Sequence, residues 1–255
     1  MCYDNDARPP TPAGEAGQAR GEEIVLASAD GTRFDAYEAR PEGRVRAQLL
    51  IYPDVRGLHK FYKDLALRFA EQGVAALAMD YFGRTAGLGA RDESFEFRPH
   101  VEQMQTPYVL ADASACLEHL RGASGASGST IIMGFCLGGS LSLYSATQDW
   151  GLAGAIAFYA GFSRVLDAEG RTALDAAPSA RTAVLGLFGG ADQGIPVEQV
   201  EALDAALDSS GVEHEVVVYP GAPHSFFDRR SAEFADASAD AWERMLGFIA
   251  AHATE

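Results

Sequence analysis

Residues 130–147, TIIMGFCLGGSLSLYSAT, decide the fold that this sequence predicts. The apolar segment Thr130–Met133 is typical of a buried strand, and Ser140–Thr147 begins a helix. Between them lies the turn Gly134-Phe135-Cys136-Leu137-Gly138-Gly139. Glycines in such a turn let the strand and the helix approach closely, while the residue at its apex is held in a strained conformation. Cys136 occupies this apex, which is the nucleophile position of a G-x-S-x-G elbow.

The elbow gives Cys136 the surroundings of a reactive thiol. The positive end of the following helix dipole lowers the pKa of a thiol and favours the thiolate. The backbone N–H of Leu137 would point at the oxyanion of a tetrahedral intermediate. A buried structural cysteine in a glycine-rich turn is the alternative interpretation. Cys116 falls within a predicted helix and is assigned to the core, and Cys2 lies in the N-terminal tail.

Outward from the elbow, strands and helices alternate along the chain. The predicted strands are Glu23–Ser28, Arg33–Ala39, Ala47–Tyr52, Val74–Met79, Thr130–Met133, Ala153–Tyr159, Ala183–Phe188 and Glu213–Tyr219. The long predicted helices are Phe61–Gln72, Val101–Leu120, Val197–Leu207 and Ala232–Ala250. Alternation of this kind predicts a single α/β domain, with a mostly parallel central sheet covered by helices on both faces. The Asp30-Gly31 turn predicts an antiparallel edge hairpin at the start of the domain, which spans residues 22–255 after a tail at 1–21.

Composition excludes several classes of protein. The 255 residues are 47% apolar, which is enough for a large core. The net charge of −16 argues against a surface for nucleic acid or anionic membranes. No apolar run of about 18 residues predicts a membrane span, and the polar first 22 residues do not resemble a signal peptide, so we expect a cytoplasmic protein. The sequence contains neither the CxxC nor the HExxH spacing that is typical of zinc sites, so we expect no metal or cofactor. We expect a small-molecule substrate, and a monomer or small homo-oligomer.

A cysteine nucleophile needs a base and an acid that orients it. Gly189-Gly190-Ala191-Asp192 follows one late predicted strand, and Gly221-Ala222-Pro223-His224 follows the last one. Each residue alone is also consistent with an ordinary loop residue, but the chain order of nucleophile, acid and histidine is that of α/β-hydrolases. Glutamine amidotransferases, which carry the acid two residues after the histidine, are disfavoured because Phe226 stands there. The long irregular segment 80–100 between two predicted elements is typical of a binding loop.

The chain resembles the dienelactone hydrolase family, the carboxymethylenebutenolidases, over about residues 22–250. Its specific marks are Gly-Phe-Cys-x-Gly-Gly at 134–139, Gly-x-x-Asp-Gln-x-Ile-Pro at 189–196 and His224-Ser225-Phe226. The resemblance implies an α/β-hydrolase fold and a catalytic triad of Cys136, Asp192 and His224.

Further site residues follow from the resemblance alone. It implies that Asp54, where the family usually has Glu, modulates the thiol, and that the N–H of Val55 is a second oxyanion donor. It implies that Arg84 binds the substrate carboxylate, and we add Tyr159 and Arg229 as substrate-binding candidates. The family's second substrate arginine is replaced by Asp228, which would repel an anion.

The predicted activity is hydrolysis of a lactone or ester through a thioester on Cys136. The alternative is the same triad acting on neutral carboxylic esters, thioesters or phosphotriesters. A non-catalytic α/β protein and a thiol redox sensor remain minor alternatives.

Overall fold

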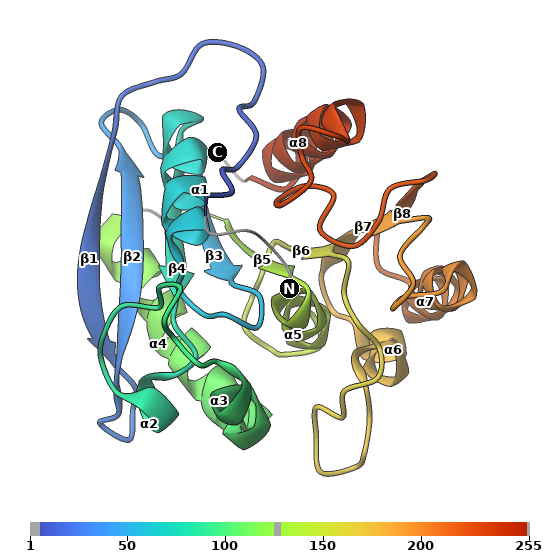
Figure 1. The fold of residues 1–255 in the computed structure, drawn as a ribbon, viewed down its shortest axis with the longest axis horizontal. Coiled ribbons are helices and arrows are strands. Elements are labelled where there is room, and N and C mark those ends of the chain that lie inside the picture. Colours follow the sequence, from blue (N-terminus) through green and yellow to red (C-terminus); the bar gives the residue numbers. More distant parts are fainter. Residues whose placement is uncertain (1–5, 125–128, 254–255) are drawn as a thin grey trace.

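The computed structural model describes residues 6–124 and 129–253. Its centre is one eight-stranded sheet with the order β1-β2-β4-β3-β5-β6-β7-β8 (Figure 1). The strands are β1 (Ala19–Ala27), β2 (Arg33–Pro41), β3 (Ala47–Tyr52), β4 (Val74–Met79), β5 (Thr130–Phe135), β6 (Gly154–Phe158), β7 (Ala183–Gly189) and β8 (His214–Tyr219).

The strand directions follow the predicted pattern. β1 and β2 form an antiparallel hairpin, and β2 also pairs antiparallel with β4. From β4 to β8 every pair is parallel. The hairpin turn contains Gly31 at φ 84°, a conformation that glycine adopts without a steric penalty.

Helices cover both faces of the sheet (Figure 1). On one face lie α1 (Lys60–Glu71) and α8 (Ala235–His252), joined by a ring contact of 4.8 Å between Phe69 and Trp242. On the other face lie α4 (Thr106–Ser124), α5 (Leu137–Ser145) and α7 (Val197–Ser210). The short helices are α2 (Gly83–Ala86), α3 (Arg98–Gln103) and α6 (Ala173–Ala176), followed by a 3-10 turn at Ala177–Ser179.

The packing of the core explains why the sequences of the central strands are apolar at nearly every position. Every residue of β3, β4, β5 and β6 is buried, because helices cover both sides of these central strands. The central strands therefore hold their carboxyl ends, and the turns that follow them, in fixed positions.

One predicted helix is divided in the structure. A single helix was expected over Val101–Leu120, whereas α3 ends at Gln103 and α4 begins at Thr106. Pro107 has no N–H to donate back to the carbonyl oxygen of Gln103, so it cannot continue α3, but it is tolerated in the first turn of α4.

The connection from β4 to α4 is anchored to the body. Arg91 pairs with the buried carboxylate of Asp80 at 2.9 Å, and its guanidinium lies 4.6 Å from the ring of Phe95. Both side chains of the ion pair are at least 95% buried, so this part of the predicted binding loop is fixed by a shielded charge pair.

The described part of the N-terminal tail packs across α1 and α8. The Trp242 indole donates to the carbonyl oxygen of Pro10 at 2.8 Å, and Arg8 pairs with Asp64 of α1 at 3.2 Å. Nearer to β1, the Gly17 N–H donates to the carbonyl oxygen of Glu71 at 2.8 Å. Cys2 and the rest of residues 1–5 lie outside the described part of the chain.

Candidate active site

The predicted elbow joins β5 to α5. Cys136 lies between them with φ 55° and ψ −112°, and its side chain is half-buried. A Cβ on Gly134 would lie 1.9 Å from the carbonyl oxygen of Gly138, and one on Gly138 would lie 2.2 Å from that of Pro53. Only glycine fits at these two positions, which is why the turn can be so tight.

Backbone hydrogen bonds fix the position of Cys136. Its N–H donates to the carbonyl oxygen of Phe158 at 3.0 Å, and its carbonyl accepts from the N–H of Ser140 at 3.1 Å. Leu137 is the first residue of α5, and the first N–H groups of a helix have no partner within the helix. The thiol thus lies at the positive end of α5.

The predicted acid and base meet in the structure. His224 Nδ1 and Asp192 Oδ2 are 2.6 Å apart, although the residues come from loops after different strands. The Asp192 side chain is 97% buried, and its other oxygen accepts from the N–H of Gly194 at 2.9 Å. A buried carboxylate with this contact favours the tautomer in which Nδ1 carries the proton and Nε2 is open to accept one.

Backbone strain is concentrated at this place. Among the described residues, those other than glycine with positive φ are Cys136 at 55°, Tyr159 at 35° and Ser225 at 63°. The ring of Tyr159 lies 4.7 Å from that of His224. Strained conformations in packed surroundings are typical of functional sites.

Cys136 and His224 line one hollow of about 200 Å³. Its other lining residues are Leu137, Ser140, Gly161, Ser163, Arg164, Gly194 and Ile195. The hollow brings together the predicted nucleophile and base, with Asp192 in contact with the far side of the imidazole.

The segment after β3 lies against the elbow through the contact of Pro53 with Gly138. Within it Asp54 is fully buried, and its Oδ1 accepts from the N–H of Arg56 at 2.8 Å. Tyr81 donates a hydrogen bond to the carbonyl oxygen of Pro53. Burial first, and then nearby charges that include those of Asp54 and Cys136, raise the pKa of the Tyr81 phenol well above its usual value. Val55, the predicted second oxyanion donor, is half-buried in the same segment.

Arg84 lies outside the hollow beside Cys136. Its guanidinium pairs with Asp112 at 2.7 Å and with Asp30 at 2.5 Å, and lies 4.7 Å from the ring of Tyr108. It lines a different hollow of about 730 Å³ beside α2 and α4. These contacts favour a structural role for Arg84, and its predicted contact with substrate stays a prediction.

Asp228 is buried, as is its hydrogen-bond partner Tyr159, whose hydroxyl donates to Asp228 Oδ2 at 2.6 Å. Burial raises the pKa of Asp228 to about 8, despite the hydrogen bonds that favour the carboxylate. Arg229 is half-buried and donates its backbone N–H to Asp228, while Arg230 pairs with Glu233 at 2.6 Å. Neither arginine lines the hollow beside Cys136.

Arg164 is the charged residue of this hollow that the sequence interpretation missed. It lies in the connection after β6 and lines the hollow together with Cys136 and His224. The available signal was its place five residues beyond Tyr159, since ligands bind at the carboxyl ends of parallel strands.

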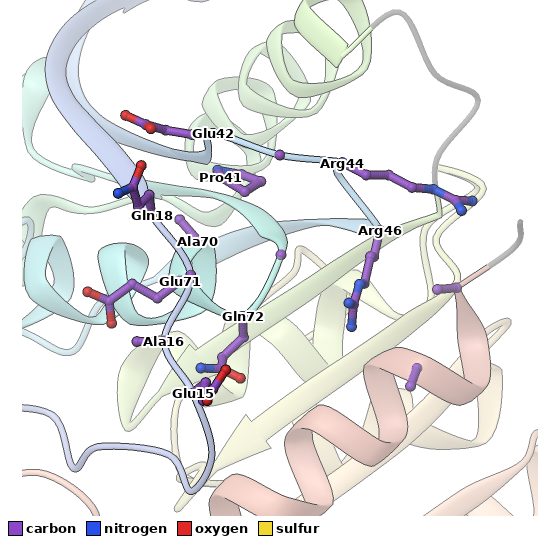
Figure 2. Close-up of a pocket in the computed structure, with 15 residues that line it drawn as sticks. Glu15, Ala16, Gln18, Pro41, Glu42, Arg44, Arg46, Ala70, Glu71 and Gln72 are labelled. Carbon is purple, nitrogen blue, oxygen red and sulfur yellow. The ribbon is translucent and has the colours of Figure 1, made fainter.

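A hollow of about 910 Å³ lies away from the thiol (Figure 2). Arg46 and Gln72, which line it, precede β3 and β4, so it lies at the amino ends of those strands. Figure 2 shows Glu15 of the tail and Arg44 among its walls, and none of the triad residues. Its greater size therefore does not make it the catalytic site.

Residues 6–124 and 129–253 contain neither a candidate metal site nor a candidate membrane span. In that part of the chain no group of three or more His, Cys, Asp and Glu side chains is arranged to bind a metal ion. No helix there is both long enough and apolar enough to cross a bilayer.

Comparisons with known proteins identify the family of the chain. A sequence model of the dienelactone hydrolase family matches residues 34–253. A "Putative carboxymethylenebutenolidase" of Methylorubrum extorquens is 30% identical over 230 residues, covering 88% of this chain and 78% of the relative. A protein of the same description from Escherichia coli K12 is 30% identical over 227 residues, covering 85% and 82%.

Solved structures show the same fold. A "Putative Dienelactone Hydrolase" from Klebsiella pneumoniae superposes with a TM-score of 0.81 at 27% identity, covering 92% of this chain and 99% of that one. A dienelactone hydrolase-like promiscuous phosphotriesterase from metagenomic libraries has a TM-score of 0.76 at 21% identity, covering 93% and 100%, and shares the fold. The likeness to the Klebsiella structure confirms the predicted α/β-hydrolase fold.

Proposed function

The chain belongs to the dienelactone hydrolase family, and from this premise we propose that it hydrolyses a lactone or carboxylic ester with Cys136 as the nucleophile. Membership confirms the resemblance that the motifs predicted, and it makes the protein a hydrolase of the carboxymethylenebutenolidase type. The choice of nucleophile and the thioester are the parts that we propose.

One observation carries the proposal. His224 contacts the buried Asp192 at 2.6 Å and lines the same hollow as Cys136. These contacts support the proposed roles of Cys136 as nucleophile, His224 as base and Asp192 as orienting acid in acyl transfer.

The proposed reaction has two halves. His224 takes the thiol proton, and Cys136 Sγ attacks the substrate carbonyl carbon. The N–H groups of Leu137 and Val55 hold the oxyanion, which collapses to a thioester as the alcohol or enol leaves with the proton from His224. Water then gives a proton to His224 and attacks the thioester, and the acid is released with the thiol restored. In a lactone the leaving oxygen stays tethered to the acyl group.

Asp54 modulates the thiol in this proposal. It is fully buried in the segment that contacts the elbow, so its charge acts through little solvent. A buried carboxylate in this segment would act on the thiol electrostatically in the resting enzyme.

Other substrates of the same triad are neutral esters, thioesters and phosphotriesters. The observation that favours them is that Asp228 stands where the family has its second substrate arginine, because a carboxylate there would repel an anionic substrate. Its raised pKa weakens the argument, because a protonated Asp228 does not repel an anion near neutral pH.

The test compares turnover of dienelactone with that of a neutral 4-nitrophenyl ester, using the wild type, Cys136→Ala and Cys136→Ser. We expect Cys136→Ala to abolish turnover of both substrates. Turnover of the neutral ester alone would support the neutral-substrate alternative. Rates unchanged in Cys136→Ala would overturn the proposal, and a reactive thiol without any turnover would indicate a redox sensor.

A further inference from the structure

We infer that Arg164 is the substrate anchor of this site, binding an anionic group on the acyl part of the ester or lactone. The inference rests on the proposed function, because it names the substrate group that the same hollow receives. It assigns to the connection after β6 a role in specificity that no motif of the chain indicates.

Position is the first argument. Arg164 lines the hollow of about 200 Å³ that Cys136 and His224 also line. Of the described residues that form this wall, it is the only lysine or arginine. An anion that enters the hollow therefore meets one positive charge of the lining, in the same hollow as Cys136 and His224.

The second argument is that the guanidinium is held in place. Nη2 donates to the carbonyl oxygens of Val101 at 3.2 Å and Met104 at 3.1 Å, at the carboxyl end of α3. Two bonds from one nitrogen fix the side chain, so less entropy is lost when a ligand binds. Nε and Nη1 make no hydrogen bond within the part of the chain that the structure describes, and both are donors.

Charge is the third argument. Arg164 is half-buried, yet within the described ranges no carboxylate lies within ion-pair distance of it. Arginines elsewhere in the molecule, among them Arg84, Arg91, Arg171 and Arg244, pair with Asp or Glu. In a chain of net charge −16, a half-buried arginine without a carboxylate partner is left open to an anion from solution.

Burial lowers the pKa of Arg164 from its usual value, which reflects a cost of holding the charge there. A guanidinium keeps its charge at any physiological pH, and a bound anion would offset this cost further than the two carbonyl oxygens do.

The size of the hollow limits the substrate. About 200 Å³ holds a group of a few carbon atoms beside the reacting carbonyl. The chemistry that fits is a small lactone with a carboxylate substituent, or the half-ester of a short dicarboxylic acid.

The test uses two alkylating reagents of nearly equal size, iodoacetate and iodoacetamide, of which only the first is an anion. In both, the thiolate displaces iodide and forms a carbon–sulfur bond. Mass spectrometry of the Cys136 peptide gives the rate constant for each, in the wild type and in Arg164→Gln. We expect Arg164→Gln to slow iodoacetate about tenfold relative to iodoacetamide, the loss expected for one charge-assisted hydrogen bond.

Two control variants separate an anchor from a structural residue. Arg171→Gln removes the same charge from the same connection, but Arg171 pairs with Asp167 and does not line the hollow, so both rates should stay within about twofold. Arg164→Lys keeps the charge without the planar guanidinium and should restore part of the preference for iodoacetate.

The outcomes separate the two proposals. If Cys136 is alkylated and the ratio of the two rates is the same in Arg164→Gln as in the wild type, the anchor is wrong and the proposed function is untouched. An equal fall of both rates in Arg164→Gln also contradicts the anchor, because it indicates a structural role. If neither reagent labels Cys136 in the folded wild type, the reactive nucleophile itself is wrong.

Discussion

Tyr159 connects the buried carboxyl group of Asp228 to the ring of His224. Its hydroxyl donates to Asp228 Oδ2 at 2.6 Å, and its ring centroid lies 4.7 Å from that of the imidazole. Burial raises the pKa of Asp228 to about 8, with Asp54 adding to the rise and His224 opposing it. The acid therefore adds no charge to the site at neutral pH, and becomes an anion only in alkaline solution.

The first prediction is an alkaline limit to activity set by Asp228. Above pH 8 its carboxylate opposes the Cys136 thiolate and the substrate anion, so kcat/KM of the wild type should fall. In Asp228→Asn the neutral form is permanent, and the fall should shift to higher pH. Profiles of kcat/KM between pH 6 and 10 would measure it, and superimposable profiles would contradict it.

A second prediction concerns stability. The ordinary pKa of Asp is 3.8, so between pH 4 and 8 the unfolded chain loses this proton while the folded protein keeps it. The stabilisation that comes from this difference in pKa is thus fully present below about pH 4. It is lost progressively as the pH rises to about 8. The Asn side chain of Asp228→Asn cannot titrate. The free energy of unfolding of this variant, relative to that of the wild type, should therefore rise over that pH range by at most about 1.4 kcal/mol per pH unit. Urea denaturation at pH 5 and 7.5 would test this, and an equal difference at both values would refute it.

Asp192→Asn should leave the fold intact and remove most of the activity. Because Oδ1 accepts from the N–H of Gly194, the Asn amide would place its NH2 group at Nδ1. An NH2 donor there favours the tautomer protonated on Nε2, which cannot take the thiol proton. A fall in kcat of about 10³- to 10⁴-fold is expected, by analogy with triads in which this carboxylate was changed. Circular dichroism and thermal melting would show that the structure persists. A loss below tenfold would mean that Asp192 does not orient the base.

Gly138→Ala should damage both stability and the site. Its Cβ would lie 2.2 Å from the carbonyl oxygen of Pro53, so the segment that carries Asp54 and Val55 must shift. Such overpacking costs about 1–3 kcal/mol. Gly43→Ala is the matched control, since a Cβ there meets nothing within 4 Å and should change stability by less than about 0.5 kcal/mol. Equal melting temperatures for the two variants would contradict the close approach.

Arg84→Met tests the interpretation of Arg84. Asp112 is 99% buried, so losing its partner leaves a buried charge and should cost about 3 kcal/mol. The KM for an anionic ester should change by less than about twofold. Arg68→Met, which breaks the more exposed pair with Glu71, should cost less than about 1 kcal/mol. A raised KM with unchanged stability would instead support the substrate contact that the family resemblance implies.

Much of the fold could be predicted because burial leaves a simple signal. β3 and β4 have the predicted limits, since a strand covered on both faces is apolar at every position. The restart of the helix at Thr106 was missed because apolar spacing continues across Met104 and Gln105, while Pro107 alone interrupts the hydrogen bonding.

The site was less evenly predictable. Cys136, Asp192 and His224 stand in motifs at the ends of strands, so the sequence places them at one edge of the sheet. The contacts of Arg84 depend on Asp112, which lies 28 residues away in a helix whose rotation the sequence does not give. Arg164 carries no motif, and its position after β6 is only a general signal, so the structure identifies it by its place in the wall of the hollow with Cys136 and His224.

The hydrogen bond from Trp242 to Pro10 spans 232 positions of the chain, and it has a consequence for biosynthesis. The ribosome synthesises the segment around Pro10 long before α8, which carries Trp242. This contact can therefore form only after nearly the whole chain has been synthesised. Contacts of such high order slow folding. Cys136 is also synthesised well before His224, so we expect the nascent chain to bring this proposed catalytic pair together only in the final stage of folding.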